Sequence, residues 1–241
     1  MGTLFKIKRR AYLLLKPIVN AVPPLKALNK WRRKRNNKKK LQTMRELGPS
    51  LAKRVVDVLE AGGYEPILVF GTLLGAVREG RFLRHDYDLD FGVELDTNED
   101  WAGLKACMEA AGFTLARQFS LRGAITEQAY EADGFLFDIF GLMPVEGSDE
   151  RRAFYYCLLD EGVYESDDDR SVKYIDLPAI DQRIYVDVDG VKLPIPANAE
   201  DCLTRAYTEH WRVPDPTWVS GTKGGWVLME GVTERRTVFS R

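Results

Sequence analysis

Two aspartates, Asp88 and Asp90, stand one residue apart in the segment 88–93, where apolar and polar residues alternate. This alternation predicts a β-strand with one apolar face, and it places both carboxylates on the other face, roughly 7 Å apart. Carboxylates at that spacing can share one Mg²⁺ or Mn²⁺, or hold two, when a phosphate supplies further oxygens. The alternative is a solvated strand face, because acidic pairs are common on exposed strands.

The residues before this pair predict the elements that position it. Residues 67–70 are short, apolar and partly β-branched, which predicts a buried strand. Gly71 allows the backbone to turn, and Thr72 can cap the short helix that follows. A helix N-terminus carries free N–H groups and a partial positive charge, so it can hold a phosphate. In this context, metal binding is the favoured interpretation of Asp88 and Asp90.

A third carboxylate, Asp138, lies in the middle of the otherwise apolar segment 135–140, which predicts another strand. Burying a carboxylate is costly unless it is paired with a cation or coordinates a metal. The residues alone therefore leave two interpretations of Asp138, a buried salt bridge and a contribution to a metal site.

The order Gly-Thr-Leu-Leu-Gly-x-x-Arg, a basic spacer and Asp-x-Asp-x-Asp resembles the LicD/fukutin family of the nucleotidyltransferase superfamily. The resemblance implies that Gly71 and Thr72 lie beside the phosphates and that Asp88 and Asp90 bind Mg²⁺ or Mn²⁺. Asp138 matches an aspartate in a Val-Asp-Ile-Phe-like stretch of that family. The match makes Asp138 the candidate general base, with a third metal ligand as the alternative.

The chain departs from the family at one place. Family members have a Trp-Asp-Asp-Asp-type stretch where this chain reads His-Asp-Tyr-Asp over residues 85–88. The roles of His85 and Asp86 therefore stay open.

The resemblance also implies a function. The chain would be a metal-dependent phosphotransferase that moves a phosphocholine-like phospho-alcohol group from a CDP-activated donor to a hydroxyl of a cell-surface glycan or lipid-linked glycan precursor. Arg78 or Arg81 would balance charge on the departing nucleotide, although each could equally be a surface charge. Two alternatives remain: a nucleotidyltransferase that places NMP on a small molecule or protein, and a non-catalytic module that binds membrane or nucleic acid.

Periodicity and turn residues predict a mixed α+β fold, and the resemblance implies that it is of the nucleotidyltransferase type, with helices flanking a mixed sheet. Helices are predicted at 50–61 and 100–111, each followed by glycine, and a strand pair at 113–121 and 124–130 turns at Arg122-Gly123. A hairpin is predicted at 185–193 around Asp189-Gly190.

Three further expectations concern the C-terminal half. Asn198 should cap a helix whose inward stripe consists of Leu203, Ala206, Tyr207 and His210. The acidic run 167–169 reads as a solvated loop, and the second acidic pair, Asp187 and Asp189, is explained by the hairpin turn. With two histidines and three widely spaced cysteines in the chain, zinc chemistry is not expected.

The net charge of −1 hides a strong asymmetry, since residues 1–40 hold 14 Lys/Arg and no Asp/Glu. We therefore divide the chain into a basic arm, 1–45, and a catalytic domain, 46–241. Pro17, Pro23 and Pro24 are expected to interrupt any helix in the arm.

The apolar run of the arm is shorter than the ~20 residues of a membrane span. Residues 4–40 fit contact with an anionic membrane surface, with a solvated tail as the alternative, and nucleic acid is not an expected partner. The expected location is cytoplasmic, peripheral at the inner membrane face.

Overall fold

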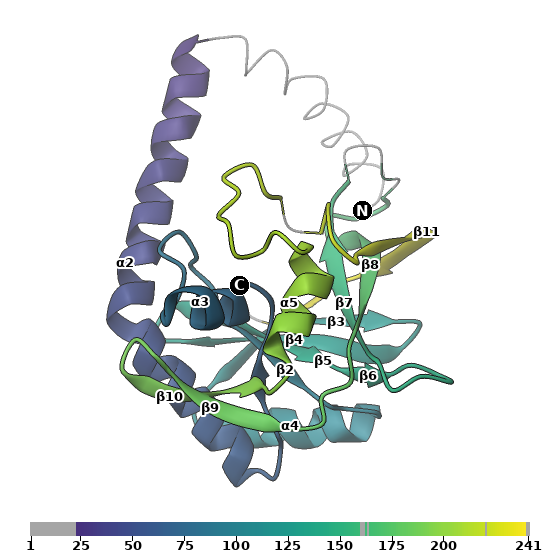
Figure 1. Cartoon of the computed structure of the whole chain (residues 1–241). Helices are drawn as coiled ribbons and strands as arrows, with labels where there is room; N and C mark the ends of the chain where they lie inside the picture. The colour runs from purple at the N-terminus through teal and green to yellow at the C-terminus, as the bar shows by residue number, and fades with distance from the viewer. Residues whose placement is uncertain (1–22, 160–161, 163, 220, 240–241) are drawn as a thin grey trace.

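The computed structural model describes residues 23–159, 162, 164–219 and 221–239, with side chains from residue 41 onward. Its centre is a six-stranded mixed sheet (Figure 1). The strands follow the order β1 (Ile67–Leu68), β2 (Asp90–Val93), β5 (Phe135–Gly141), β4 (Ala124–Ala132), β3 (Thr114–Leu121) and β12 (Thr237–Val238). β2 and β5 run parallel, and the other neighbours run antiparallel. The mixed α and β character predicted from the sequence is confirmed.

A second sheet and a separate hairpin complete the β structure. The sheet has the order β11 (Val227–Arg235), β8 (Asp169–Leu177), β7 (Arg151–Cys157) and β6 (Met143–Pro144), and the hairpin consists of β9 (Arg183–Val188) and β10 (Val191–Pro196). The predicted turns are confirmed: Arg122, Gly123, Asp189 and Gly190 all have positive φ, as two-residue hairpin loops require.

The helix α2 (Pro23–Ala61) is far longer than predicted, with 39 residues and Pro49 inside it. At 1.5 Å per residue it is about 58 Å long, and its first half extends past the sheets in Figure 1. The expectation that Pro23 and Pro24 interrupt any helix is wrong, because proline is well tolerated in the first turn, where its missing N–H would be unpaired anyway. The predictions for residues 4–22 lie outside the described residues.

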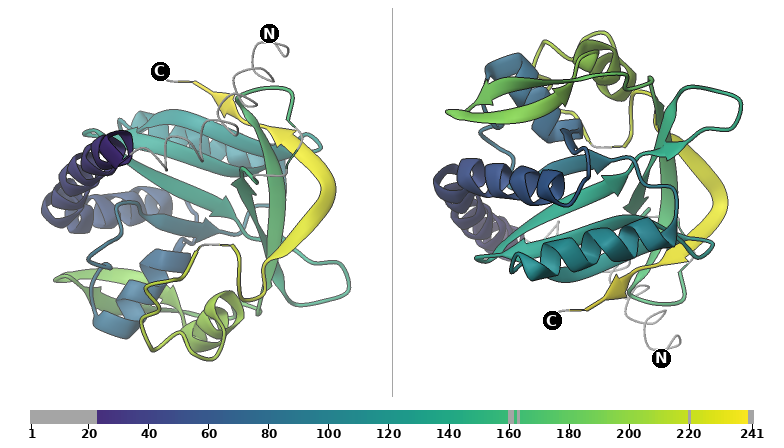
Figure 2. Two further views of the ribbon diagram at one scale, coloured as in Figure 1. Left: turned by 90° about the horizontal axis from the view of Figure 1, so that it is seen from above. Right: turned by 90° about the horizontal axis from the view of Figure 1, so that it is seen from below.

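One face of the central sheet packs against two helices, α2 and α4 (Asn98–Ala110), which Figure 2 shows on the same side. The predicted inward residues of α4, Trp101, Leu104 and Met108, are fully buried there. Leu89, Phe91 and Val93 also point into this core, as their alternation predicted. The polar residues of β2 consequently face the opposite side, toward the second sheet.

The connection from β1 to β2 is made by α3 (Phe70–Glu79). The predicted strand 67–70 is shorter than expected, since the helix already begins at Phe70. Thr72 does not cap the helix, because the N-cap residue is Val69, without a side-chain cap bond. Thr72 lies in the first turn and is buried.

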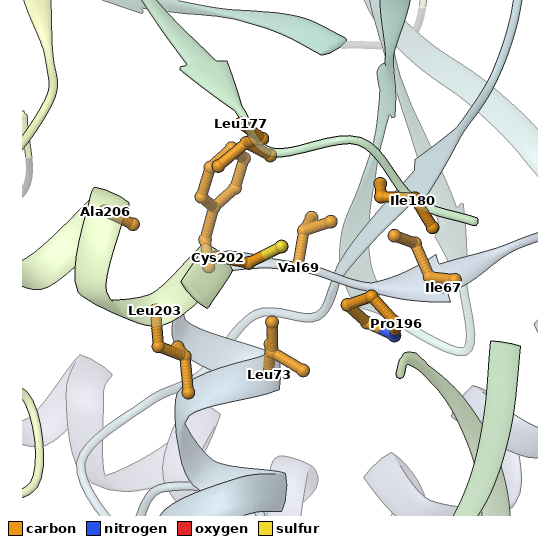
Figure 3. Close-up of a pocket in the computed structure, with 10 residues that line it drawn as sticks. Ile67, Val69, Leu73, Leu177, Ile180, Pro196, Cys202, Leu203 and Ala206 are labelled. Carbon is orange, nitrogen blue, oxygen red and sulfur yellow. The ribbon is translucent and has the colours of Figure 1, made fainter. Parts of the chain in front are cut away.

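Helix α5 (Ala199–Tyr207) docks beside α3 and β1. Figure 3 shows their apolar side chains converging on a cavity of about 10 Å³, hardly large enough for one water molecule. Leu203 and Ala206 are buried as predicted, whereas His210 is exposed, because the helix ends three residues before it. Asn198 has the predicted N-cap position, but its side chain donates to the Ala179 carbonyl at 2.8 Å instead.

The acidic run 167–169 is only partly the solvated loop that was predicted: Asp167 is exposed in a turn, whereas the prediction is wrong for Asp169. Asp169 is 7% exposed and begins β8. It accepts hydrogen bonds from the backbone N–H groups of Glu165 and Ser166, both at 2.8 Å, and from Arg235 Nε at 2.9 Å. Burial would raise the pKa of Asp169, but these donors hold it below its ordinary value. The run ties the C-terminal strand to β8.

Among the described residues, no helix combines the length and the apolar composition needed to cross a membrane.

Candidate active site

The backbone of Asp90 is fixed on both sides to the junction of β1 and α3. Its N–H donates to Thr72 Oγ1 at 2.9 Å, and its carbonyl accepts from the Val69 N–H at 3.2 Å. The short helix and the strand that begins at Asp90 therefore hold each other in place, whereas Asp88 lies in the segment before that strand. The Thr72 hydroxyl oxygen accepts the hydrogen bond from Asp90, which leaves its O–H free to donate, so the predicted contact of Thr72 with phosphate stays a prediction.

The strand register brings Asp138 next to Asp90. In the parallel pair of β2 and β5, Asp90 lies opposite Asp138, and the Asp138 N–H donates to the Leu89 carbonyl at 2.9 Å. On the other side of β5, Asp138 lies opposite Ala129 of β4, and Ala129 lies opposite Arg117 of β3. Four residues on four adjacent strands thus form one row, with the smallest side chain between Arg117 and Asp138.

Arg117 reaches across Ala129 to Asp138. Its Nη2 donates to Oδ1 at 2.8 Å and to Oδ2 at 3.0 Å, and Asp138 is 7% exposed. Burial raises the pKa of Asp138 above its ordinary value, and the Arg117 charge opposes that rise. The salt bridge foreseen for Asp138 is therefore present. Its role as a general base stays a prediction.

The carboxylates form one electrostatic cluster. Burial raises the pKa of Asp90 well above its ordinary value, and the negative charges of Asp88, Asp86 and Asp138 raise it further. The structure thus brings together the three predicted carboxylates and also Asp86, whose role the sequence left open. His85, its neighbour, is exposed.

Gly71 provides the close approach that the cluster requires. A Cβ at this position would lie 2.6 Å from Asp86 Oδ2 and 3.8 Å from Asp90 Oδ2. Phe70, just before it, has φ of 48°, a left-handed conformation that is strained for a bulky residue and is often found at functional sites. The absence of a side chain at Gly71 lets the Asp86 carboxylate pack directly against the backbone beside Asp90.

The carboxylate oxygens of the cluster repel one another and gather beside Gly71, where a Cβ would not fit. Such a group of oxygens suits a hard divalent cation. Within the described residues, however, no three acidic, histidine or cysteine side chains form a complete metal site. A cation held by Asp88 and Asp90 would need further oxygens, and a diphosphate has them.

The two predicted phosphate-binding arginines differ in their surroundings. Arg78 donates from Nη1 to the Trp211 carbonyl at 3.2 Å, and its Nε is buried without a hydrogen-bond partner. Both arginines pair with Glu79, Arg78 at 3.2 Å and Arg81 at 3.3 Å, but the side chain of Arg78 is 12% exposed and that of Arg81 is 41% exposed. The unpaired buried donor makes Arg78 the better candidate of the two.

Two tyrosines border the cluster. Burial raises the pKa of Tyr207, and the charges of Asp90, Asp86 and Asp88 raise it further. The pKa of Tyr155 is likewise raised, mainly by burial. Both phenols therefore stay neutral and can donate hydrogen bonds at the edge of the site. Tyr207 was predicted to pack first, whereas nothing in the sequence pointed to Tyr155.

Sequence reasoning also missed Glu127, which is 4% exposed on β4. Burial raises its pKa well above the ordinary value, the Asp138 charge raises it further, and Arg117 lowers it. Its segment, Thr-Glu-Gln, carries no apolar alternation that would have signalled burial.

Glu127 should make stability fall as pH rises. Above its ordinary pKa of 4.5, this glutamate is ionised in the unfolded chain but stays protonated in the folded protein. The unfolding free energy therefore falls by up to about 1.4 kcal/mol per pH unit until the raised pKa is reached. We expect Glu127→Gln to flatten the decline of the unfolding free energy as the pH rises above about 5, measured by urea titration.

The matched control is Glu131→Gln, an exposed position on the same strand. It should leave the pH dependence unchanged. If Glu127→Gln and the unaltered protein give parallel curves, Glu127 is ionised in both states and the expectation fails.

A cleft of about 460 Å³ lies elsewhere, lined among others by Tyr64, Glu94, Arg183 and Tyr185. Glu94 follows β2 at the end away from Asp90. None of the predicted site residues lines this cleft, so the carboxylate cluster and the cleft are separate features.

Comparison with known proteins agrees with this geometry. The family described as LicD/FKTN/FKRP, nucleotidyltransferase domain, matches residues 63–156, which hold the whole carboxylate row. Ribitol 5-phosphate transferase FKRP from Mus musculus and from Homo sapiens are each 37% identical over 84 residues. The match covers 35% of this chain and 16% of each relative's length.

Among solved structures, the antibiotic-resistance factor ANT(2'')-Ia overlaps with a TM-score of 0.34 at 18% identity, over 44% of this chain and 52% of that chain. At this TM-score and identity, we draw no conclusion about this chain from that structure.

Proposed function

We propose that the chain is a metal-dependent phosphotransferase, because residues 63–156 match the family described as LicD/FKTN/FKRP, nucleotidyltransferase domain. It moves a phospho-alcohol group from a CDP-activated donor to a hydroxyl of a glycan or a lipid-linked glycan precursor. The observation that carries the proposal is the row of Asp90, Asp138 and Arg117, together with the Asp86 carboxylate that packs against the backbone of Gly71.

In this proposal Asp88 and Asp90 hold Mg²⁺ or Mn²⁺, which neutralises charge on the donor's diphosphate. Gly71 lies beside the donor's phosphates, and Arg78 balances the charge that develops on the departing CMP. Such transfer asks the protein mainly for positioning and charge neutralisation, and these residues supply both.

Asp138 accepts the proton of the attacking hydroxyl. Burial moves its pKa upward, toward the range in which a base works best near neutral pH. Arg117 fixes the carboxylate through both oxygens and keeps it ionised despite the neighbouring acids. The bond formed joins the acceptor oxygen to phosphorus, and CMP leaves with the electron pair.

The relatives carry the name ribitol 5-phosphate transferase, which adds ribitol 5-phosphate to phosphocholine as a candidate group. The basic residues of the arm support contact with an anionic membrane surface, where a lipid-linked acceptor would be met.

The test is calorimetric titration of CDP-choline and CDP-ribitol with and without Mn²⁺, repeated on Asp88→Ala. We expect metal-dependent binding that the variant loses, and the tighter ligand identifies the group. Arg152→Met, an ion-pair variant on the second sheet, is the control and should bind as before. Absence of any metal-dependent nucleotide binding would refute the proposal.

Product analysis separates this function from nucleotidyl transfer. Free CMP with a phospho-modified acceptor supports the phosphotransferase, whereas release of pyrophosphate from CTP indicates a nucleotidyltransferase with the same carboxylates.

A further inference from the structure

Two further arginines, Arg170 and Arg236, lie near Arg117. Burial lowers the pKa of Arg170 below its ordinary value, and the positive charges of Arg236 and Arg117 lower it further. The charges of Arg117 and Arg236 therefore repel Arg170, while the Asp168 charge opposes the lowering of its pKa. Arginine stays protonated in proteins, so this repulsion cannot be relieved by loss of a proton.

The cluster forms where the C-terminal strands join the two sheets. Arg170 on β8 lies opposite Glu234 of β11. The chain then passes through Arg236 into β12, where Val238 pairs with Arg117 of β3. Figure 2 shows this C-terminal segment, in yellow, running along the second sheet to the edge of the central one. The three arginines thus come from two sheets and the link between them.

Two of the arginines have a carboxylate partner. Arg117 pairs with Asp138, and Arg236 Nη2 donates to Asp168 Oδ1 at 2.8 Å. The Nε groups of Arg117 and Arg236 are buried without a hydrogen-bond partner. Unpaired buried donors are costly and call for an explanation.

Arg170 differs from both. Its Nη1 donates to two backbone carbonyls, those of Asp167 and Asp169, each at 2.8 Å. Within the described residues no carboxylate forms an ion pair with it, since Asp168 pairs with Arg236 and the opposing Glu234 accepts from the Arg122 N–H at 2.9 Å. Of the three arginines, Arg170 is thus the one without a carboxylate ion pair of its own in the part of the chain that the structure describes, although the nearby Asp168 charge acts on it.

The cluster remains accessible to solutes. The side chains of Arg117 and Arg236 are 28% and 26% exposed, and Arg170 is half-buried. Partly desolvated guanidinium groups with free donors match the oxygens of a phosphate, which each can bind through its planar fork.

The geometry points to an anion-binding subsite, formed by Arg117, Arg170 and Arg236 beside Asp138, that takes a phosphate group of the substrate. This inference rests on the proposed function for its biological role. The subsite lies on the Arg117 side of Asp138, whereas Asp88 and Asp90 lie on the other, so it is distinct from the metal pair.

The test is calorimetric titration of the full chain with inorganic phosphate in the absence of divalent metal. We expect saturable binding that Arg170→Met weakens by roughly tenfold or more, with Arg170→Lys in between, because lysine keeps the charge but loses the fork. Thermal melts establish that each variant is folded. Arg152→Met, which removes a carboxylate-paired arginine from β7, is the matched control and should bind phosphate as before.

Three results would overturn the inference: no phosphate binding by the unaltered protein, equal binding by Arg170→Met, or an equal loss in Arg152→Met. Because no nucleotide or metal is present, these outcomes are independent of whether the chain transfers a phospho-alcohol.

Competition distinguishes the source of the phosphate. If CDP-choline with Mn²⁺ displaces inorganic phosphate, the subsite takes a donor phosphate. If inorganic phosphate and CDP-choline bind together, it takes a phosphate carried by the acceptor, and Arg170→Met should then raise the KM for a phosphorylated acceptor without weakening donor binding.

Discussion

Replacing Asp90 with asparagine is expected to abolish transfer while making the folded protein more stable. Burial and the charges of Asp88, Asp86 and Asp138 raise the pKa of the Asp90 carboxylate. At neutral pH the ionised form of Asp90 is therefore repelled by these neighbours. Asparagine keeps the shape and the backbone bonds to Thr72 and removes that repulsion.

We expect activity to fall on the order of 10³-fold and the unfolding free energy to rise by about 1 kcal/mol, as often happens when a strained functional residue is neutralised. Turnover of a CDP-alcohol and urea unfolding without metal measure the two effects. Added Mn²⁺ should stabilise the unaltered protein and leave Asp90→Asn unaffected.

The second acidic pair provides the control. Asp187 belongs to an Asp-x-Asp sequence in the β9–β10 turn, where its Oδ1 accepts from the Gly190 N–H at 3.0 Å. Asp187→Asn should change neither activity nor the response to Mn²⁺. If Asp90→Asn keeps its activity, or if it is destabilised, the carboxylate cluster is not the strained metal site described above.

Replacing Arg117 with methionine is expected to have the largest effect on stability. The buried carboxylate of Asp138 would lose its cation and remain beside Asp88, Asp90 and Glu127. Removing one partner of a buried pair costs roughly 3–5 kcal/mol, because it leaves an uncompensated buried charge. We expect a loss of about 3 kcal/mol in unfolding free energy, together with loss of transfer.

A double-mutant cycle separates charge from packing. Adding Asp138→Asn to Arg117→Met should recover much of the stability, because the uncompensated charge is gone, but none of the activity. The comparison pair is Arg152 and Asp176, joined at 2.6 Å and 2.7 Å on β7 and β8 away from the acidic cluster. Arg152→Met should cost about 1 kcal/mol. Equal losses in Arg117→Met and Arg152→Met would contradict the special position of Asp138.

Local features of the fold were predictable because they depend on neighbouring residues. Alternation of Leu89, Phe91 and Val93 predicted a strand with one apolar face, and helical spacing in 100–111 predicted the buried stripe of α4. The turns at Arg122-Gly123 and Asp189-Gly190 followed from residues that tolerate positive φ. Each of these predictions uses a periodicity or a turn preference that operates over a few residues.

Other features were missed because tertiary contacts decide them. The acidic run 167–169 has the composition of a solvated loop, but Arg235 and Arg236, far along the chain, pair with Asp169 and Asp168. His210 has the helical spacing of an inward residue, yet α5 ends before it. A sequence pattern shows what a segment can form, and the packing of distant segments decides which part of it is used.

The pairing of Asp138 with Arg117 shows most clearly which features the local sequence predicts and which depend on tertiary packing. Leu121 pairs with Ala124 across the turn, so unbroken pairing would place Arg117 opposite Gln128. Two irregularities in the pairing of β3 with β4 shift the register between them and place Arg117 opposite Ala129, in the row that ends at Asp138. Such irregularities arise from the twist and packing of the whole sheet rather than from the residue types alone.

The sequence by itself determined the residues able to carry the chemistry: Asp88 and Asp90 at strand spacing, Gly71 before a short helix, and a lone Asp138 in an apolar strand. Only the tertiary structure decided that Asp86 and Glu127 join them and that Arg117 pairs with Asp138. The physical reason is that a side chain's type and local spacing are written in the chain, whereas the charges it meets depend on strand register and on segments far away in sequence.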